Sequence, residues 1–129
     1  MILTEILSQE IVTAARSYLG KPFDWDTFNC VHFIRMVYRD VGIVFPVLKR
    51  YDYPPAEFHL SAEAFSKMPI GHSVFFKRKA KSTARFWSHV AIIIGEDTLI
   101  HNTRHLGQGV SITEVSSLLY VYDLAEQAT

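Results

Sequence analysis

Apolar positions recur with the period of an α-helix near the start of the chain. Residues 4–19 carry one such stripe, and Gly20 is placed to end that helix as the residue after its C-terminal cap. A second stripe begins after Asn29, a residue type favoured at helix N-termini, and runs to Gly42. Its members, at helical spacing, are Cys30, Phe33, Ile34, Val37, Tyr38 and Val41. The pattern predicts two amphipathic helices, with Cys30 in the first turn of the second helix and on its buried face.

Later in the chain, the apolar residues form the short runs and alternations that are typical of β-strands. The predicted strands are 73–78, 86–95, 98–102, 109–113 and 118–124, with turn residues at 95–97 and 107–109. Between helices and strands, residues 43–70 are rich in proline and aromatic residues and predict a packed surface excursion with a short helix near 62–67. Helices followed by strands indicate an α+β domain, with N-terminal helices packed on an antiparallel sheet. A length of 129 residues fits a single domain over 1–129.

Composition and charge limit the kinds of partner that are expected for this chain. Thirteen basic residues balance thirteen acidic ones, so no broad field attracts nucleic acid, and no apolar run is long enough for integral membrane association. The N-terminus has no basic region, and Glu5 and Glu10 interrupt its apolar stretch, so a signal peptide is not expected. The chain is therefore expected to be made in the cytoplasm and to act outside it only after delivery by a phage or a secretion system. The basic run 77–85 predicts a solvated hairpin loop or, alternatively, a binding site for an anionic partner.

Candidate chemistry centres on the one cysteine. A single cysteine excludes an intrachain disulfide and a multi-cysteine zinc site, and leaves either a small buried apolar residue or a nucleophile. A helix N-terminus and a nearby imidazole both favour the thiolate form of a cysteine. Cys30 is predicted to lie at a helix N-terminus. His89 is the first residue of the apolar strand that follows Ser88, and it is suited to be the imidazole near the cysteine. The next strand returns beside it, and the register of the turn decides whether His101 or Asn102 lies near His89.

Four segments resemble the NlpC/P60 family of papain-like cysteine peptidases and amidases, which cut the peptide stems of bacterial peptidoglycan. These segments are Asn29-Cys30-Val31-His32-Phe33, Gly71-His72-Ser73-Val74-Phe75-Phe76, Ser88-His89-Val90-Ala91-Ile92 and Ile100-His101. The resemblance implies a papain-like fold, with Cys30 as nucleophile, His89 as general base and His101 as the orienting residue. It implies no cofactor and no metal. The chain also resembles amidase effectors injected between bacteria and phage-tail hydrolases, so an immunity or carrier protein is a compatible partner.

The chain departs from the usual family pattern Asp-Cys-Ser-Gly-Phe at Asn29, Val31 and His32. His32 lies about 200° around the helix from Cys30, so a surface or packing role is expected. The substrate-binding candidates are Phe23, Asp24, Trp25, Asn29, Tyr51 and Ser88. The departures leave two alternatives open. One is a thiol hydrolase or acyltransferase that acts on another amide or a lipid ester. The other is a catalytically inactive binding module of a phage tail or secretion apparatus.

Overall fold

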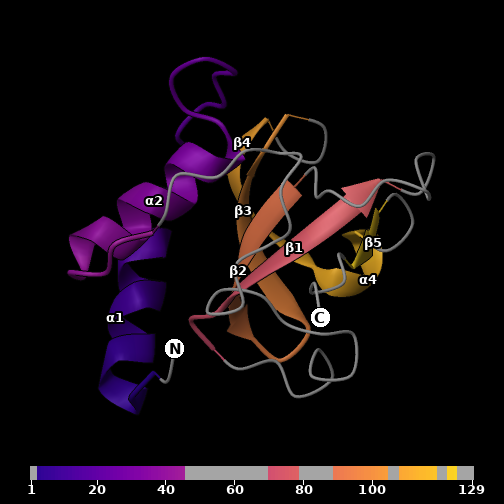
Figure 1. Ribbon diagram of the computed structural model, residues 1–129. Helices are drawn as coiled ribbons and strands as arrows, with labels where there is room; N and C mark the ends of the chain where they lie inside the picture. Colours follow the sequence, from indigo (N-terminus) through magenta and orange to yellow (C-terminus); the bar gives the residue numbers. More distant parts are fainter. Residues whose placement is uncertain (1–2, 46–69, 79–88, 105–107, 119–121, 125–129) are drawn as a thin grey trace.

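The computed structural model describes residues 3–45, 70–78, 89–104, 108–118 and 122–124 (Figure 1). The elements in these residues, in chain order, are α1 (Glu5–Arg16), α2 (Cys30–Asp40), β1 (Ser73–Arg78), β2 (His89–Gly95), β3 (Thr98–Thr103), β4 (Gly109–Glu114), α4 (Val115–Leu118) and β5 (Tyr122–Leu124). The described strands form one five-stranded sheet in the order β4-β3-β2-β1-β5, and every neighbouring pair is antiparallel. The predicted α+β class, with helices packed on an antiparallel sheet, is confirmed.

The N-terminal helix is shorter than its apolar stripe predicts. Thr4 caps α1 by accepting a hydrogen bond from the Leu7 N–H at 3.1 Å. The helix ends at Arg16, and the Ser17 hydroxyl donates to the Ala14 carbonyl at 2.6 Å. A serine hydroxyl that binds backbone in this way competes with continued helix, which explains the early end. Gly20 does adopt a positive φ of 84°, but it lies beyond the helix end, so its predicted role as the residue after the cap was wrong.

The second helix matches its prediction closely. Asn29 caps α2, and the side chains of the predicted stripe are buried from Cys30 to Tyr38. The chain leaves the helix after Asp40 and turns at Gly42, whose φ is 82°. A positive φ costs glycine little, and this explains why the helix stops here. Cys30 is therefore held at the first helical position on the face that packs against the sheet.

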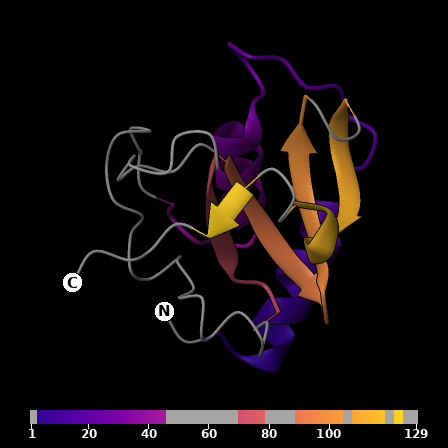
Figure 2. The ribbon, with the colours of Figure 1, turned by 90° about the vertical axis from the view of Figure 1, so that its right-hand side faces the viewer.

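Two apolar clusters cover the two faces of the sheet. The larger one joins α1 and α2 to Val90, Ile92 and Ile100, and the smaller one joins Ala91, Ile93 and Leu99 to α4. Figure 2 shows α4 on the near side of the sheet and the long helices behind it. Successive strand residues face opposite sides, so nearly continuous apolar runs are expected in strands that are covered on both faces.

The predicted strand boundaries hold within a residue or two for β1, β3 and β4. The described part of the segment predicted as β2 begins at His89, because 86–88 lie outside the described residues. The prediction of a strand over 118–124 was partly wrong: Leu118 ends the short helix α4, and the strand β5 is Tyr122–Leu124. Val115 and Leu118 are both buried and lie three residues apart, a spacing that shares one face of a helix but not of a strand. The predicted helix near 62–67 and residues 79–85 of the basic run also lie outside the described part of the chain.

Gly109 lets the segment before α2 approach the sheet. The Val110 N–H donates to the Lys21 carbonyl, and the Gly20 N–H donates to the Val110 carbonyl, both at 3.0 Å. A Cβ at Gly109 would lie 2.5 Å from the Lys21 oxygen, and the φ of this residue is 151°. The missing side chain therefore fixes where residues 22–28 run, and these residues lead directly to Cys30.

The change Gly109→Ala is expected to lower the free energy of unfolding by about 2–4 kcal/mol, because the added methyl group meets backbone at an unfavourable φ. Gly20→Ala is the matched control, since Gly20 also has a positive φ, but a Cβ added there would meet no atom within 4 Å. The control should lose only about 1–2 kcal/mol. Urea unfolding of both variants measures the difference. Equal losses would show that the contact with Lys21 is unimportant.

Candidate active site

Cys30 sits at the first position of α2, at the positive end of the helix dipole. The side chain is 3 % exposed and belongs to the core cluster that joins α2 to the sheet. The positive end of the helix dipole stabilises an anion at this position. The surrounding burial opposes ionisation, so a reactive thiolate here requires a partner that accepts its proton.

The helix start is organised by a capping box. The Asn29 Oδ1 accepts hydrogen bonds from the Val31 and His32 N–H groups at 3.0 and 3.1 Å, and the His32 Nδ1 accepts from the Asn29 N–H at 3.0 Å. His32 therefore takes the place of the glutamate or glutamine that completes such a box. The expectation of a surface or packing role for His32 was incomplete, because its ring also fixes Asn29, the residue directly before Cys30.

Replacing His32 separates this capping role from other effects. His32→Ala is expected to lower the free energy of unfolding by about 1 kcal/mol, since the Asn29 N–H loses its acceptor. His32→Gln should lose less, because a glutamine at this position can accept the same hydrogen bond. Urea unfolding at pH 7.5 measures both variants. An equal loss in the two would contradict the capping role.

Two histidines meet between β2 and β3. His89 Nε2 lies 2.8 Å from His101 Nδ1, and His101 Nε2 lies 2.9 Å from the Thr113 hydroxyl on β4. The two rings are in edge-to-face contact, with centroids 5.0 Å apart. His101 is fully buried, and His89 is 5 % exposed. Burial lowers the pKa of His101 from 6.5 to about 4, so this ring is neutral at neutral pH.

The neutral state of His101 is compatible with one consistent assignment of protons. If His101 Nδ1 accepts from the His89 Nε2–H, then the single proton of His101 is on Nε2, from which it donates to the Thr113 oxygen. In that assignment the Nδ1 of His89 has no proton and can act as a base. The hydrogen bond from Nε2 would fix the tautomer and the ring plane of His89, which is what a third catalytic residue does.

Asn102 makes a different connection. Its Nδ2 donates to the carbonyl oxygens of Phe28 and Asn29 at 2.7 and 3.1 Å, and the side chain is fully buried. These carbonyls come directly before Cys30. The two residues that the sequence left as alternatives therefore lie in different environments: His101 contacts His89, and Asn102 ties β3 to the residues that precede the cysteine. The approach of Cys30 to His89 itself stays a prediction.

Three predicted substrate-binding residues, Phe23, Asp24 and Trp25, line a cavity of about 560 Å³, while the fourth one before α2, Asn29, caps the helix instead. Phe23 and the half-exposed Trp25 have ring centroids 6.2 Å apart. Asp24 shapes the turn, since its Oδ1 accepts from the Asp26 and Thr27 N–H groups, and the hydrogen bond from Thr27 is the main reason that its pKa is lowered.

The sequence interpretation missed two residues of this cavity, Arg104 and Gln108. Gln108 has a φ of 56°, which is unusual for a residue other than glycine. The turn signal at 107–109 was the only hint of this position. Tyr51 and Ser88, the remaining substrate-binding candidates, lie outside the described residues.

Within the described ranges, no group of three or more His, Cys, Asp or Glu side chains is placed to hold a metal ion. No helix in that part of the chain is long and apolar enough to cross a membrane.

Comparisons with known proteins agree with the fold. A family model described as the NlpC/P60 family matches residues 20–127. Among solved structures, the NlpC/p60 domain of the peptidoglycan hydrolase SagA is 25 % identical, with a TM-score of 0.66 and coverage of 94 % of this chain and 98 % of that one. A search of the curated proteins gives no significant match.

Two further structures share the fold at lower identity. An NlpC/P60 family protein from Bacillus cereus is 22 % identical, with a TM-score of 0.68, and the match covers 93 % of this chain and 39 % of that one. NlpC2 from Trichomonas vaginalis is 18 % identical, with a TM-score of 0.72, and the match covers 97 % of this chain and 47 % of that one. The chain thus spans less than half of each of these two proteins and almost all of the SagA domain.

Proposed function

Because the chain belongs to the NlpC/P60 family, whose members are generally peptidoglycan hydrolases of the cysteine peptidase type, we propose that it hydrolyses an amide bond in peptidoglycan stem peptides. The observation that carries the proposal is the contact between His89 and a His101 ring that burial keeps neutral. A histidine held in one tautomer on a core strand, with a cysteine at a helix start, is the arrangement that thiol catalysis requires.

In the proposed reaction, the Nδ1 of His89 takes the proton of the Cys30 thiol, and the thiolate sulfur attacks the amide carbonyl carbon. The oxyanion forms near the N-terminus of α2, where the helix dipole favours negative charge. His89 then gives its proton to the leaving amine as the C–N bond breaks and a thioester forms. Water, deprotonated by His89, attacks the thioester, and the acid and the Cys30 thiol are released. No cofactor or metal takes part.

The cavity beside the 22–28 segment is the proposed substrate cleft. Phe23 and Trp25 offer apolar ring surface, and Asp24, Arg104 and Gln108 offer polar groups. Asn29 acts indirectly, by holding the helix start through its cap. Tyr51 and Ser88 remain part of the proposal as substrate contacts.

We further propose that residues 1–129 act as a single catalytic domain. We also propose that a phage or a secretion system delivers the protein to peptidoglycan, and an immunity or carrier protein would be compatible with such a route.

The experiment is to incubate the purified protein, with Cys30→Ala as the matched control, with peptidoglycan of several wall types and to identify the released fragments by mass spectrometry. Fragments that require Cys30 would establish the hydrolase and identify its bond. Transfer of an acyl group from a lipid donor to Cys30, without wall fragments, would favour the thiol hydrolase or acyltransferase that acts on lipid. A protein without either activity, and with an ordinary thiol, would be a binding module.

A further inference from the structure

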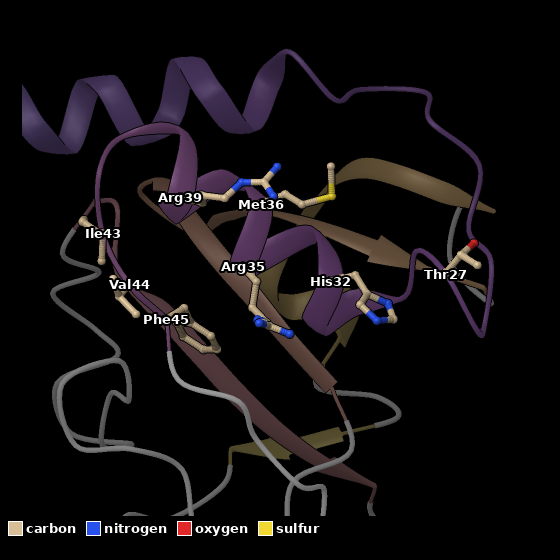
Figure 3. Close-up of a pocket in the computed structure, with 8 residues that line it drawn as sticks. All are labelled: Thr27, His32, Arg35, Met36, Arg39, Ile43, Val44 and Phe45. Carbon is tan, nitrogen blue, oxygen red and sulfur yellow. The ribbon is translucent and has the colours of Figure 1, made fainter.

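The outer face of α2 is turned away from the nucleophile. Its residues line a cavity of about 430 Å³ (Figure 3). The helical members of this lining are His32, Arg35, Met36 and Arg39. They lie about 140° to about 240° around the helix axis from Cys30, which is the opposite side of α2. Contacts that hold Cys30 relative to the two histidines therefore come from the side on which α2 packs against the sheet.

On that side, one amide group of β3 holds the two peptide units before the cysteine. The Asn102 Nδ2 donates to the Phe28 carbonyl at 2.7 Å and to the Asn29 carbonyl at 3.1 Å, and Asn102 is fully buried. The Asn29 carbonyl belongs to the peptide unit that joins Asn29 to Cys30. Asn102 is therefore hydrogen-bonded to the same peptide unit from which the nucleophile begins.

Both carbonyls also accept a hydrogen bond from the backbone. The Asp24 N–H donates to the Phe28 carbonyl at 3.0 Å, within the turn that precedes the helix. The Phe33 N–H donates to the Asn29 carbonyl at 3.1 Å, in the first turn of α2. The Asn102 amide thus joins β3 to the turn before the helix and to the helix itself.

The other end of the same segment is attached to the neighbouring strand. Val110 on β4 is the cross-strand partner of Asn102. The Val110 N–H donates to the Lys21 carbonyl, and the Gly20 N–H donates to the Val110 carbonyl, both at 3.0 Å. Residues 20–29, which include members of the proposed substrate cleft, are therefore attached at both ends to one pair of facing residues in the sheet.

The residue before Asn102 leads to the proposed base. His101 Nδ1 lies 2.8 Å from His89 Nε2. Successive side chains of a strand point to opposite faces, so His101 and Asn102 extend from β3 in opposite directions. One of them contacts His89, and the other contacts the peptide unit of Cys30. Because a displacement of about 1 Å between reacting groups can slow a reaction about 100-fold, the span between these two contacts matters for catalysis.

We propose that Asn102 is a positioning residue, whose hydrogen bonds to the two carbonyls before Cys30 hold the thiol where His89 can take its proton. This inference rests on the proposed function, because it takes Cys30 as nucleophile and His89 as base. Asn102 touches neither the substrate nor the reacting atoms in this role. Its loss is therefore expected to change kcat and the reactivity of the thiol, and to change substrate affinity little.

The test replaces Asn102 with leucine, which has a similar shape but no hydrogen-bond donor. Within the described part of the chain, the Asn102 Oδ1 has no hydrogen-bond partner, so leucine also removes an unpaired buried acceptor. Both carbonyls keep their backbone donors, and the variant is expected to fold, which a thermal unfolding curve checks. Asn102→Ser is the second variant, because its smaller side chain fits the same space and its hydroxyl is one bond shorter.

Thr98→Val is the matched control. Thr98 lies at the other end of β3, and its hydroxyl donates to the Glu96 carbonyl at 3.2 Å. The control therefore removes a hydrogen bond between a side chain of the same strand and a backbone carbonyl, but at a distance from Cys30.

Two quantities are measured for each protein: kcat and KM on a stem peptide, and the pH midpoint of Cys30 alkylation by iodoacetamide. Both Asn102 variants are expected to lower kcat about 10- to 100-fold and to leave KM within about threefold of the wild-type value. They should also raise the alkylation midpoint by about one pH unit, because the thiolate is no longer held beside His89. Thr98→Val should change neither quantity.

The alkylation profile does not require turnover, so it separates this inference from the proposed function. A midpoint that rises in the Asn102 variants alone, in a protein that cleaves no peptidoglycan, would support the positioning role and overturn the proposed substrate. Folded Asn102 variants that cleave at the wild-type kcat would support the hydrolase and overturn the positioning role. An unchanged midpoint, an equal change in Thr98→Val, or an ordinary midpoint of about 8.5 in the wild type would overturn it as well.

Discussion

Replacing His89 with glutamine is expected to reduce the rate of amide cleavage by about 10³- to 10⁴-fold, because the substitution removes the base that we propose takes the Cys30 proton. Glutamine keeps a similar length and can still hydrogen-bond to His101, so the fold should survive. The measurement is kcat/KM on a stem peptide, with a thermal unfolding curve to show that the variant is folded. His72→Gln is the matched control, since His72 is a half-buried histidine outside the proposed machinery.

The thiol provides a second readout of the same prediction. The pH profile of alkylation by iodoacetamide reports the pKa of Cys30 directly, since this is the only cysteine of the chain. With His89 as its partner, the midpoint should lie below the ordinary value of about 8.5, and in His89→Gln it should move up. A variant that cleaves at the normal rate, or a midpoint that does not move, would remove His89 from the mechanism.

The stability of the protein is expected to fall by about 3 kcal/mol between pH 7 and pH 4 through His101 alone. Burial lowers the pKa of His101 from 6.5 to about 4 in the folded state. In the unfolded chain His101 therefore becomes protonated below pH 6.5, whereas in the folded chain it stays neutral until about pH 4. Between these two pH values the unfolded state becomes more stable relative to the folded state. Above pH 6.5 neither state is protonated, so the contribution of His101 to stability is fully present there.

Urea unfolding at several pH values, with His101→Gln beside the wild type, isolates this contribution. The pKa of His72 is also lowered by burial and acts in the same direction, but it acts equally in both proteins. The difference between the two proteins should therefore shrink as the pH falls from 6.5 to 4. A difference that is independent of pH would mean that His101 titrates normally in the folded protein.

The helical pattern was sufficient to predict α2 and the position of its cysteine. The spacing of apolar residues identifies the buried face, and Asn29 marks the start of the helix. The role of His32 was not predicted, since its angle around the helix excludes contact with Cys30 but does not address the backbone of the N-terminal turn. The signal was present, because His32 occupies the third helical position, where an acceptor completes a capping box.

The choice between His101 and Asn102 illustrates what sequence alone does not decide. Both residues are polar and adjacent, and a one-residue change of register exchanges the faces to which they point. The pairing of Ile92 with Ile100, and the irregularity between Ile93 and Gly95, set the register in the folded protein. The error at 118–124 has a similar cause, because a four-residue helix has no period long enough to detect.

Side chains along β3 point to alternate faces of the sheet, and this limits how the length of the strand can change. His101 reaches partners on β2 and β4, and the next side chain, Asn102, reaches the two carbonyls ahead of Cys30. One residue inserted between Thr98 and His101 would turn both side chains to the wrong face and remove both connections together. Two inserted residues would restore the faces but would displace both side chains by about 6.6 Å along the strand, away from these partners. The length of β3 between Thr98 and His101 is therefore fixed by two separate contacts, a constraint that holds whatever amino acids are inserted.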